Sequence, residues 1–262
     1  MMGTYSRIVA AGILLGSLGW CVAHEAKAEP LVTDRPDFTE SAETVAPGRV
    51  QIEAGYTFTR REDDEENALG ELLLRVGLLE KLELRIAVNS YVWVDSPGGD
   101  AEGLEDISLG AKIKLVDGSK DFDLTQPNVA VIVATTLPTG ADDIGEDELQ
   151  PEITLALAWD LSEKFSLGSN LNYAYLSEDG DRFHQFSGSV VLGYTLTEKW
   201  GTYIEFFGFV PESEDGPNAS FFNGGLTYLI NDDLQLDARV GVGLFNADSP
   251  DYFTGLGVSW RW

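Results

Sequence analysis

The stretch LSEKFSLGSNLNYAY, residues 161–175, joins a short charged turn to a run in which apolar and polar residues alternate. From Phe165, every second residue is predominantly apolar, and the residues between are small or polar. A period of two is typical of a β-strand with two different faces. Similar turns open LLEKLELRIAV at Leu78, LTEKWGTYIEF at Leu196 and LINDDLQLDARV at Leu229. The repetition predicts a series of antiparallel strands.

Twelve such alternating runs follow one another along the chain. They lie near residues 50–58, 72–78, 82–88, 107–115, 129–133, 153–159, 165–175, 190–194, 200–206, 226–230, 236–244 and 256–262. Their connections alternate between two kinds. Five are turns, four of them very short, near 79–81, 117–126, 162–164, 197–199 and 231–233. The other six, near 61–66, 95–105, 139–148, 178–182, 211–218 and 246–251, contain 22 of the 44 acidic residues.

An even number of antiparallel strands with short turns at one end and longer loops at the other is typical of an outer-membrane β-barrel. The sequence therefore predicts an all-β fold, a twelve-stranded antiparallel transmembrane β-barrel with short periplasmic turns and longer acidic extracellular loops. A soluble secreted β-barrel would also show alternation, with the apolar face inward. Aromatic residues near the short turns favour the membrane barrel, because such rings gather at the lipid–water interface. The predicted girdle is Trp159, Phe165, Trp200, Trp260 and Trp262.

The N-terminus has the features of a cleaved leader. Arg7 precedes an apolar or small-residue stretch, 8–22, and Ala26-Lys27-Ala28 has the form of a signal-peptidase site. We expect a signal peptide at 1–28, a polar periplasmic segment at 29–48 and the barrel at 49–262, located in the outer membrane. The single cysteine, Cys21, lies in the leader; a lipoprotein site there is the alternative, which the bulky Trp20 disfavours.

The charge balance limits the partners. The chain has 17 Lys and Arg against 44 Asp and Glu, so its negative charge disfavours binding to nucleic acid, which is also negative. The acid runs at 62–66 and 142–148 are interpreted as solvated loops, with loose divalent bridging to lipopolysaccharide as the alternative. No EF-hand spacing occurs, and we predict no metal site and no cofactor. His184 and Ser187 have opposite strand parity, so no catalytic pair and no enzyme is predicted.

Charged residues lie on the polar face well inside the strands, where a membrane barrel has its lumen. The candidates for lumen or selectivity residues are Glu53, Glu71, Arg75, Arg85, Lys112, Lys114, Glu205, Asp237 and Arg239. The bases of this group either control which solutes pass or are neutralised by cross-strand carboxylates that hold the barrel together. The carboxylates proposed for that second role are Glu53, Glu71, Glu83 and Asp237. Both interpretations stay open.

Two N-terminal segments, TDRPDFTES at 33–41 and PGRVQIEAGYTF from Pro47, resemble the entry of a family of bacterial outer-membrane transporters. That family is named for its association with the meta-cleavage pathway of phenol degradation. The closing GVSWRW resembles the terminal-strand signal that is recognised by the barrel assembly machinery. The resemblance implies a Gram-negative envelope protein that passes small molecules, with lipid and lipopolysaccharide as its surroundings.

The function predicted from these features is passive passage of small solutes, including aromatic or other small organic compounds. A closed barrel with an envelope-structural or surface-binding role is the alternative. Because both ends of an even-stranded barrel lie on one side, the polar segment begins near the lower lumen. We expect Asp34, Arg35, Asp37 and Glu40 to form a plug, with the carboxylates of Asp34, Asp37 and Glu40 on the lumen bases; a flexible periplasmic tail is the alternative.

Overall fold

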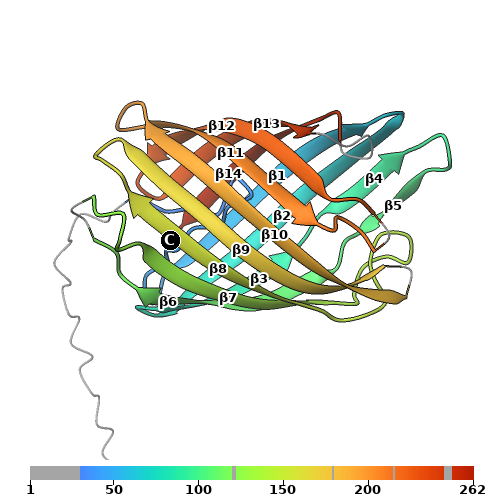
Figure 1. Ribbon diagram of the computed structural model, residues 1–262, viewed down its shortest axis with the longest axis horizontal. Helices are drawn as coiled ribbons and strands as arrows, with labels where there is room; N and C mark the ends of the chain where they lie inside the picture. The colour runs from blue at the N-terminus through green and yellow to red at the C-terminus, as the bar shows by residue number, and fades with distance from the viewer. Residues whose placement is uncertain (1–29, 120–121, 179, 215, 245–249) are drawn as a thin grey trace, which may run out of the picture.

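The computed structural model describes residues 30–119, 122–178, 180–214, 216–244 and 250–262, and they form a closed β-barrel (Figure 1). The strands are β1 (Val50–Arg61), β2 (Asp64–Leu79), β3 (Leu82–Val88), β4 (Tyr91–Asp95), β5 (Ala101–Leu104), β6 (Ile107–Val116), β7 (Asn128–Leu137), β8 (Gln150–Asp160), β9 (Phe165–Glu178), β10 (Asp181–Thr195), β11 (Trp200–Val210), β12 (Ala219–Asn231), β13 (Leu234–Leu244) and β14 (Tyr252–Arg261). No helix in these ranges is long and apolar enough to cross a membrane.

The barrel closes because β1 pairs antiparallel with both β2 and β14. Each remaining wall strand pairs with its neighbours in the chain. β2 pairs first with β3 and then with β4, so β3 and β4 are two parts of one strand interrupted at 89–90. β5 and β6 form the next strand, interrupted at 105–106. The wall therefore has twelve strands, which confirms the predicted barrel.

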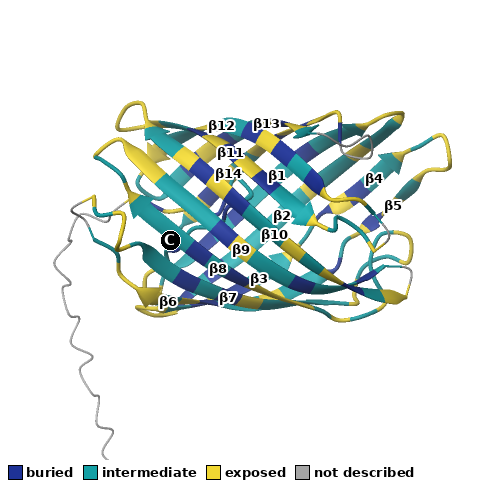
Figure 2. Cartoon of the chain, viewed as in Figure 1, coloured by how far each residue is buried: buried dark blue, intermediate teal, exposed yellow. Residues whose placement is uncertain are grey.

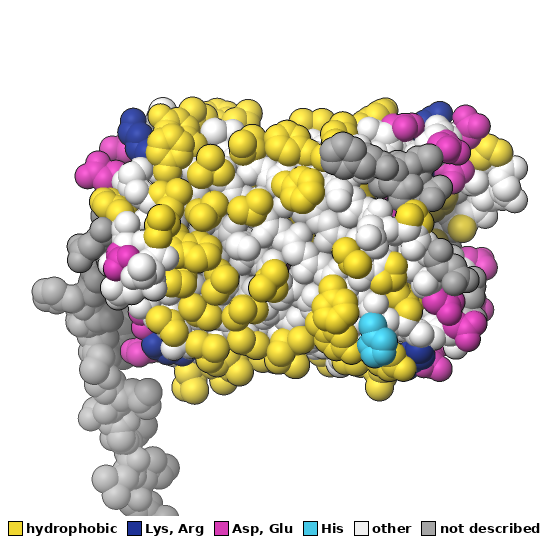
Figure 3. Space-filling model, in the orientation of Figure 1, with side chains coloured by type: hydrophobic (Ala, Val, Ile, Leu, Met, Phe, Trp, Pro, Cys, Tyr) yellow, Lys and Arg dark blue, Asp and Glu magenta, His cyan; other side chains and the backbone are white. Residues whose placement is uncertain are grey.

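The two faces of the wall differ as a membrane barrel requires. Leu171 is 59% exposed on the outside, whereas Asn170, its neighbour in the chain, is 1% exposed and faces inward. Figure 2 shows this alternation along the strands, and Figure 3 shows apolar side chains over the outer surface, with acids at both ends. Apolar residues outside and charged residues inside are the reverse of a soluble barrel. The soluble alternative is therefore wrong.

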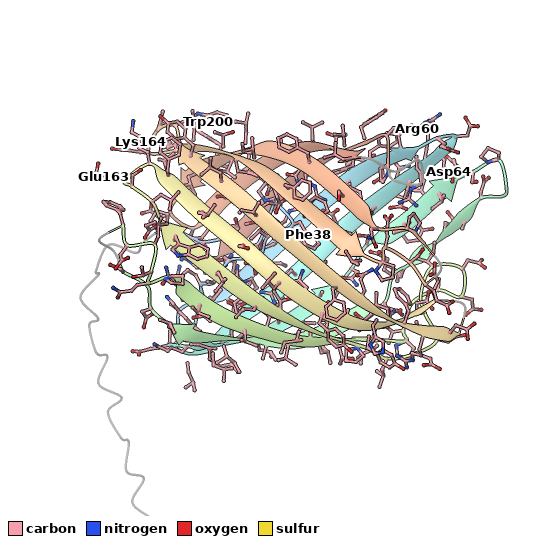
Figure 4. All side chains as sticks on the ribbon, viewed as in Figure 1. Phe38, Arg60, Asp64, Glu163, Lys164 and Trp200 are labelled. Carbon is pink, nitrogen blue, oxygen red and sulfur yellow. The ribbon has the colours of Figure 1, made fainter. Side chains whose placement is uncertain are left out.

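The two ends of the barrel differ in their connections. We call the left end of Figure 1, with the turns at 79–81, 162–164, 197–199 and 231–233, the turn end, and the opposite end the loop end. Figure 4 labels Glu163, Lys164 and Trp200 at the turn end, and Arg60 and Asp64 at the loop end.

Two predicted long loops are tight hairpins instead. β1 and β2 stay paired up to Arg61 and Asp64, so the connection expected at 61–66 is a two-residue turn. The connection expected at 178–182 is equally short, because β10 already begins at Asp181. Strands that extend beyond the lipid are solvated on both faces and so tolerate acids on either face. The acidic composition was therefore misleading about loop length.

The predicted loop at 95–105 is also partly strand, since β5 occupies Ala101–Leu104 and pairs with β4. Beside β5, the next connection is held by the buried carboxylate of Asp106. This carboxylate accepts hydrogen bonds from the N–H groups of Thr139, Gly140 and Glu146 at 2.8, 2.6 and 2.9 Å. The N–H of Ala141 donates to the carbonyl of Leu104 at 2.8 Å. The loop is thus ordered against the edge of β5.

Candidate functional site: the occupied lumen

The N-terminal segment 30–48 lies inside the barrel, where Figure 1 shows it as an irregular blue trace, and it reaches from the turn end to the middle of the lumen. Its backbone contacts begin at Leu31, whose N–H donates to the carbonyl of Asp232 at 2.8 Å. The N–H of Val45 donates to the Glu83 carboxylate at 2.8 Å. The segment is therefore bonded to the wall near both of its ends.

Asp34 is the centre of a buried ion-pair network. Its carboxylate accepts hydrogen bonds from Arg85 at 2.5 Å and from Lys112 at 3.0 and 2.9 Å, and Arg75 lies 3.4 Å away. These side chains are at most 8% exposed. Because a buried charge without a partner costs about 3–5 kcal/mol, the three bases favour a carboxylate at this place.

The same bases also form cross-strand pairs. Arg75 bonds Glu53 and Glu83 at 2.9 Å each, and Arg85 bonds Glu83 at 3.1 Å. These bases therefore contact carboxylates of the wall as well as a carboxylate of the N-terminal segment. Whether they also control which solutes pass stays a prediction. The charges of the three bases equal those of three acids, Asp34, Glu53 and Glu83.

A second set of contacts surrounds Arg35. Its guanidinium contacts the Glu71 carboxylate and lies 3.6 Å from the carboxylate of Asp237. Arg239 donates to the carbonyl of Pro36 at 2.9 Å and lies 3.5 Å from Glu71. This set again balances two bases with two acids.

Three wall glycines give the segment room. A Cβ atom on Gly77 would lie 2.1 Å from the carbonyl oxygen of Ala46. On Gly55 and Gly257 it would lie 2.3 and 2.5 Å from the Arg35 guanidinium. A side chain at position 77 would therefore require a shift of the segment backbone, whereas one at position 55 or 257 would require the Arg35 side chain to move.

Glu205 holds the middle of the segment. Its carboxylate accepts hydrogen bonds from the N–H groups of Phe38 and Thr39 at 2.9 and 2.7 Å. It also accepts bonds from the Thr39 hydroxyl at 2.6 Å and from the Asn223 amide at 2.6 Å. These four donors are neutral, and in the part of the chain that the structure describes no cation forms an ion pair with Glu205.

Phe38 packs into an aromatic cluster on the inner wall. Its ring stacks on Phe207 with centroids 4.6 Å apart, and Phe207 stacks on Phe221 at 4.7 Å. Phe209 meets Phe38 edge-on at 5.4 Å. Figure 4 shows Phe38 in the interior, midway along the barrel. This cluster adds apolar packing to the ionic contacts of the segment.

Glu40 forms an ion pair with Arg85. Among the described residues, no lumen base lies within ion-pair distance of Asp37, so its expected docking on these bases stays a prediction. Arg239, a base on the same side of the lumen, is already engaged by Pro36, Glu71 and the Thr57 hydroxyl.

Lys114 links the segment to the turn end. Its ammonium bonds the carboxylate of Glu43 at 2.9 and 2.7 Å and lies 3.0 Å from that of Asp117. Asp117 also accepts a hydrogen bond from Lys81 at 2.6 Å. The hydrogen bonds from Lys81 and Lys114 lower the pKa of the exposed Asp117 carboxyl to about 2.

The proposed girdle residues lie at the turn end as ring pairs. Phe165 contacts Tyr194 with centroids 4.7 Å apart, and Trp200 contacts Tyr228 at 4.6 Å. Trp260 and Trp262 contact each other at 4.6 Å. The Trp159 indole donates to the carbonyl of Leu124 at 2.9 Å. All but Trp159 are more than 40% exposed. Their role at a membrane interface stays a prediction.

His184 is exposed on β10, near the loop end, and contacts two tyrosines. Tyr173 contacts it through a 2.9 Å hydrogen bond between the hydroxyl and Nδ1, and the Tyr175 ring stacks on it at 4.9 Å. Within the described ranges, no group of three or more His, Cys, Asp or Glu side chains is placed to hold a metal ion. The described parts of the acid runs at 62–66 and 142–148 are included in that statement.

Several residues that shape the lumen were not among the sequence candidates. The aromatic cluster could have been found by parity, since Phe207, Phe209 and Phe221 occupy the polar face of their strands. Asn170 also lies on the polar face of its strand, whereas Phe38 lies in a segment without periodicity and carries no such signal.

The sequence matches the model of one protein family over residues 33–262, the family described as "Putative MetA-pathway of phenol degradation". None of the curated protein sequences gives a significant match.

Solved structures share the fold at low sequence identity. An outer membrane channel of Pseudomonas putida F1 has 15% identity and a TM-score of 0.66, covering 84% of this chain and 98% of its own. The NanC porin has 12% identity and a TM-score of 0.55, covering 80% and 98%. The KdgM porin has 12% identity and a TM-score of 0.51, with the same coverage. These likenesses establish the barrel fold.

Proposed function

The chain belongs to the family described as "Putative MetA-pathway of phenol degradation", and from that premise we propose that it is an outer-membrane channel for passive diffusion of small solutes, narrowed by its own N-terminal segment. The observation that supports this most is the occupied lumen. A polar, charged interior inside an apolar exterior suits water and solutes. The similar structures with channel and porin names make the same function more plausible.

The size of the free space favours small solutes. Five cavities of about 600, 340, 700, 310 and 390 Å³ flank the N-terminal segment. Each is of the size of a small-molecule pocket, about 300–1,000 Å³. Small organic compounds, including aromatic ones, fit this space and the aromatic cluster around Phe207.

In this proposal the segment 30–48 is a plug. Its ionic contacts with Arg75, Arg85 and Lys112 and the packing of Phe38 hold it across the lumen. We place the protein in the outer membrane after removal of a leader at 1–28, with lipid and lipopolysaccharide around it. The closing GVSWRW would be recognised by the barrel assembly machinery.

Conductance in planar bilayers tests the channel. Purified protein should give discrete conductance steps, and deletion of residues 30–44 should raise the conductance of each step. Absence of steps in both proteins, each shown to be folded by heat-modifiable migration on gels, would instead support the closed barrel with a structural role.

A further inference from the structure

The free space of the lumen is divided by the N-terminal segment. The cavities of about 600, 310 and 390 Å³ lie toward the loop end, since Glu105, Gln185 and Pro250 are among their lining residues. The cavities of about 700 and 340 Å³ lie toward the turn end, beside Asp117 and Arg261. A solute that crosses the barrel must pass from one group to the other.

Glu40 borders both groups. It lines the 600 and 310 Å³ cavities on the loop side and also the 700 Å³ cavity on the turn side. Asp37 is shared by the 390 and 700 Å³ cavities. Glu40 thus lies between the 600 and 310 Å³ cavities of the loop end and the 700 Å³ cavity of the turn end. Its side chain is 27% exposed.

The position of Glu40 is held from both sides. When the Asn170 amide is oriented to satisfy its neighbours, its oxygen accepts from the Glu40 N–H at 2.8 Å and its nitrogen donates to the Glu40 carbonyl at 3.1 Å. The side chain is held by Arg85. Side chains fixed by their surroundings define a pore more sharply than mobile ones.

The charge at this narrow place is negative. Arg75, Arg85 and Lys112 are already balanced by Asp34, Glu53 and Glu83, so the carboxylate of Glu40 is in excess although it contacts Arg85. Glu152, which is exposed to the lumen, lines the same two loop-end cavities as Glu40, those of 600 and 310 Å³. Within a narrow passage of low dielectric, unbalanced charge concentrates counter-ions strongly.

We infer that solutes pass the plug beside Glu40, and that Glu40 and Glu152 make this passage selective for cations and for small solutes with a positively charged group. Glu40 is then a specificity-determining residue located on the plug rather than on the wall. This inference rests on the proposed channel function.

Reversal potentials across a tenfold KCl gradient provide the test, with Glu40→Gln, Glu152→Gln and the double variant. Glu163→Gln, at a short turn outside the passage, removes the same charge and serves as the control. We expect the potassium-to-chloride permeability ratio to fall at least threefold in the double variant and to stay unchanged in the control. An unchanged ratio in the double variant would overturn the inference.

Chemical modification gives a second measurement. A cationic methanethiosulfonate reagent should block Glu40→Cys when added from either side of the bilayer, because Glu40 borders both groups of cavities. The chain's only cysteine, Cys21, lies in the predicted leader. Lack of block from one side would also overturn the inference. A wild-type protein without conductance would disprove the channel itself. Failure of the proposed channel function is therefore distinguishable from failure of the inference about Glu40.

Discussion

The Nζ atom of Lys112 lies 3.0 and 2.9 Å from the two carboxylate oxygens of Asp34. Both side chains are buried, and Arg75 and Arg85 share the same carboxylate. The pair joins the wall strand β6 to Asp34 of the N-terminal segment, and Asp34 lies sixteen residues before the first strand. The docking of that segment therefore depends on an electrostatic contact that is strongly destabilised when one partner is lost.

Replacement Asp34→Asn should weaken docking, because three buried bases lose the charge that they share. Breaking a buried ion pair typically costs about 3–5 kcal/mol. We expect larger or noisier single-channel currents than in the wild type. Glu163→Gln is the control for loss of one acid. Currents identical to the wild type in a folded Asp34→Asn protein would contradict the plug.

Replacement Phe38→Ala should loosen the same segment by another route, since its ring leaves the Phe207 cluster. Loss of a fully buried Phe costs about 3–5 kcal/mol, and Phe38 is partly buried, so we expect opening that is about 10-fold faster or more. Hydrogen exchange of the Thr39 and Val45 amides reports this opening. Phe165→Ala, on the outer face, should leave both rates unchanged. Equal protection in the two variants would show that the cluster does not hold the segment.

Cysteine labelling should separate the two faces of β9. Leu171→Cys should react with a lipid-soluble maleimide, because that side chain is on the apolar exterior. Asn172→Cys should react with a small water-soluble reagent, because Asn172 faces inward and donates to the Ser187 hydroxyl at 2.9 Å. The opposite pattern would be incompatible with a membrane barrel.

Selectivity should depend on salt through the acidic loop end. The Debye length falls from about 30 Å at 0.01 M to about 3 Å at 1 M, so charge at the mouth acts mainly in dilute salt. We expect cation preference to be greatest at 0.01 M and to decline as salt rises. Anion preference that does not change with salt would show that the lumen bases, not the loops, control entry.

Replacement Asp106→Asn should release the 139–148 loop. The amide has one oxygen acceptor in place of the two that now bind three backbone N–H groups. We expect faster proteolysis within this loop, with the barrel intact. Asp143→Asn lies in the same loop and removes the same charge, so it should leave the cleavage rate as in the wild type. Equal rates in both variants would show that Asp106 is not the anchor.

The sequence by itself determined the wall. Alternation as in Phe165 to Tyr175 places side chains on opposite faces of a strand for geometric reasons, so twelve such runs give a barrel wall with one apolar and one polar face. The aromatic residues near the short turns then favoured lipid on the apolar face. The lumen candidates could be named for the same reason, since parity alone puts Arg75, Lys112 and Asp237 inside. The acidic composition of 61–66 led to the wrong prediction of a long loop, because composition does not distinguish a loop from a strand that is solvated on both faces.

Only the tertiary structure decided what those inward residues contact. The segment 30–48 has no periodicity, so nothing local assigns Asp34 to Lys112 or Phe38 to Phe207. Such contacts join residues up to 221 positions apart, as between Arg35 and Leu256, and they exist only once the barrel has closed around the segment. The position of Glu40 between two groups of cavities likewise depends on the space that remains after the lumen is filled.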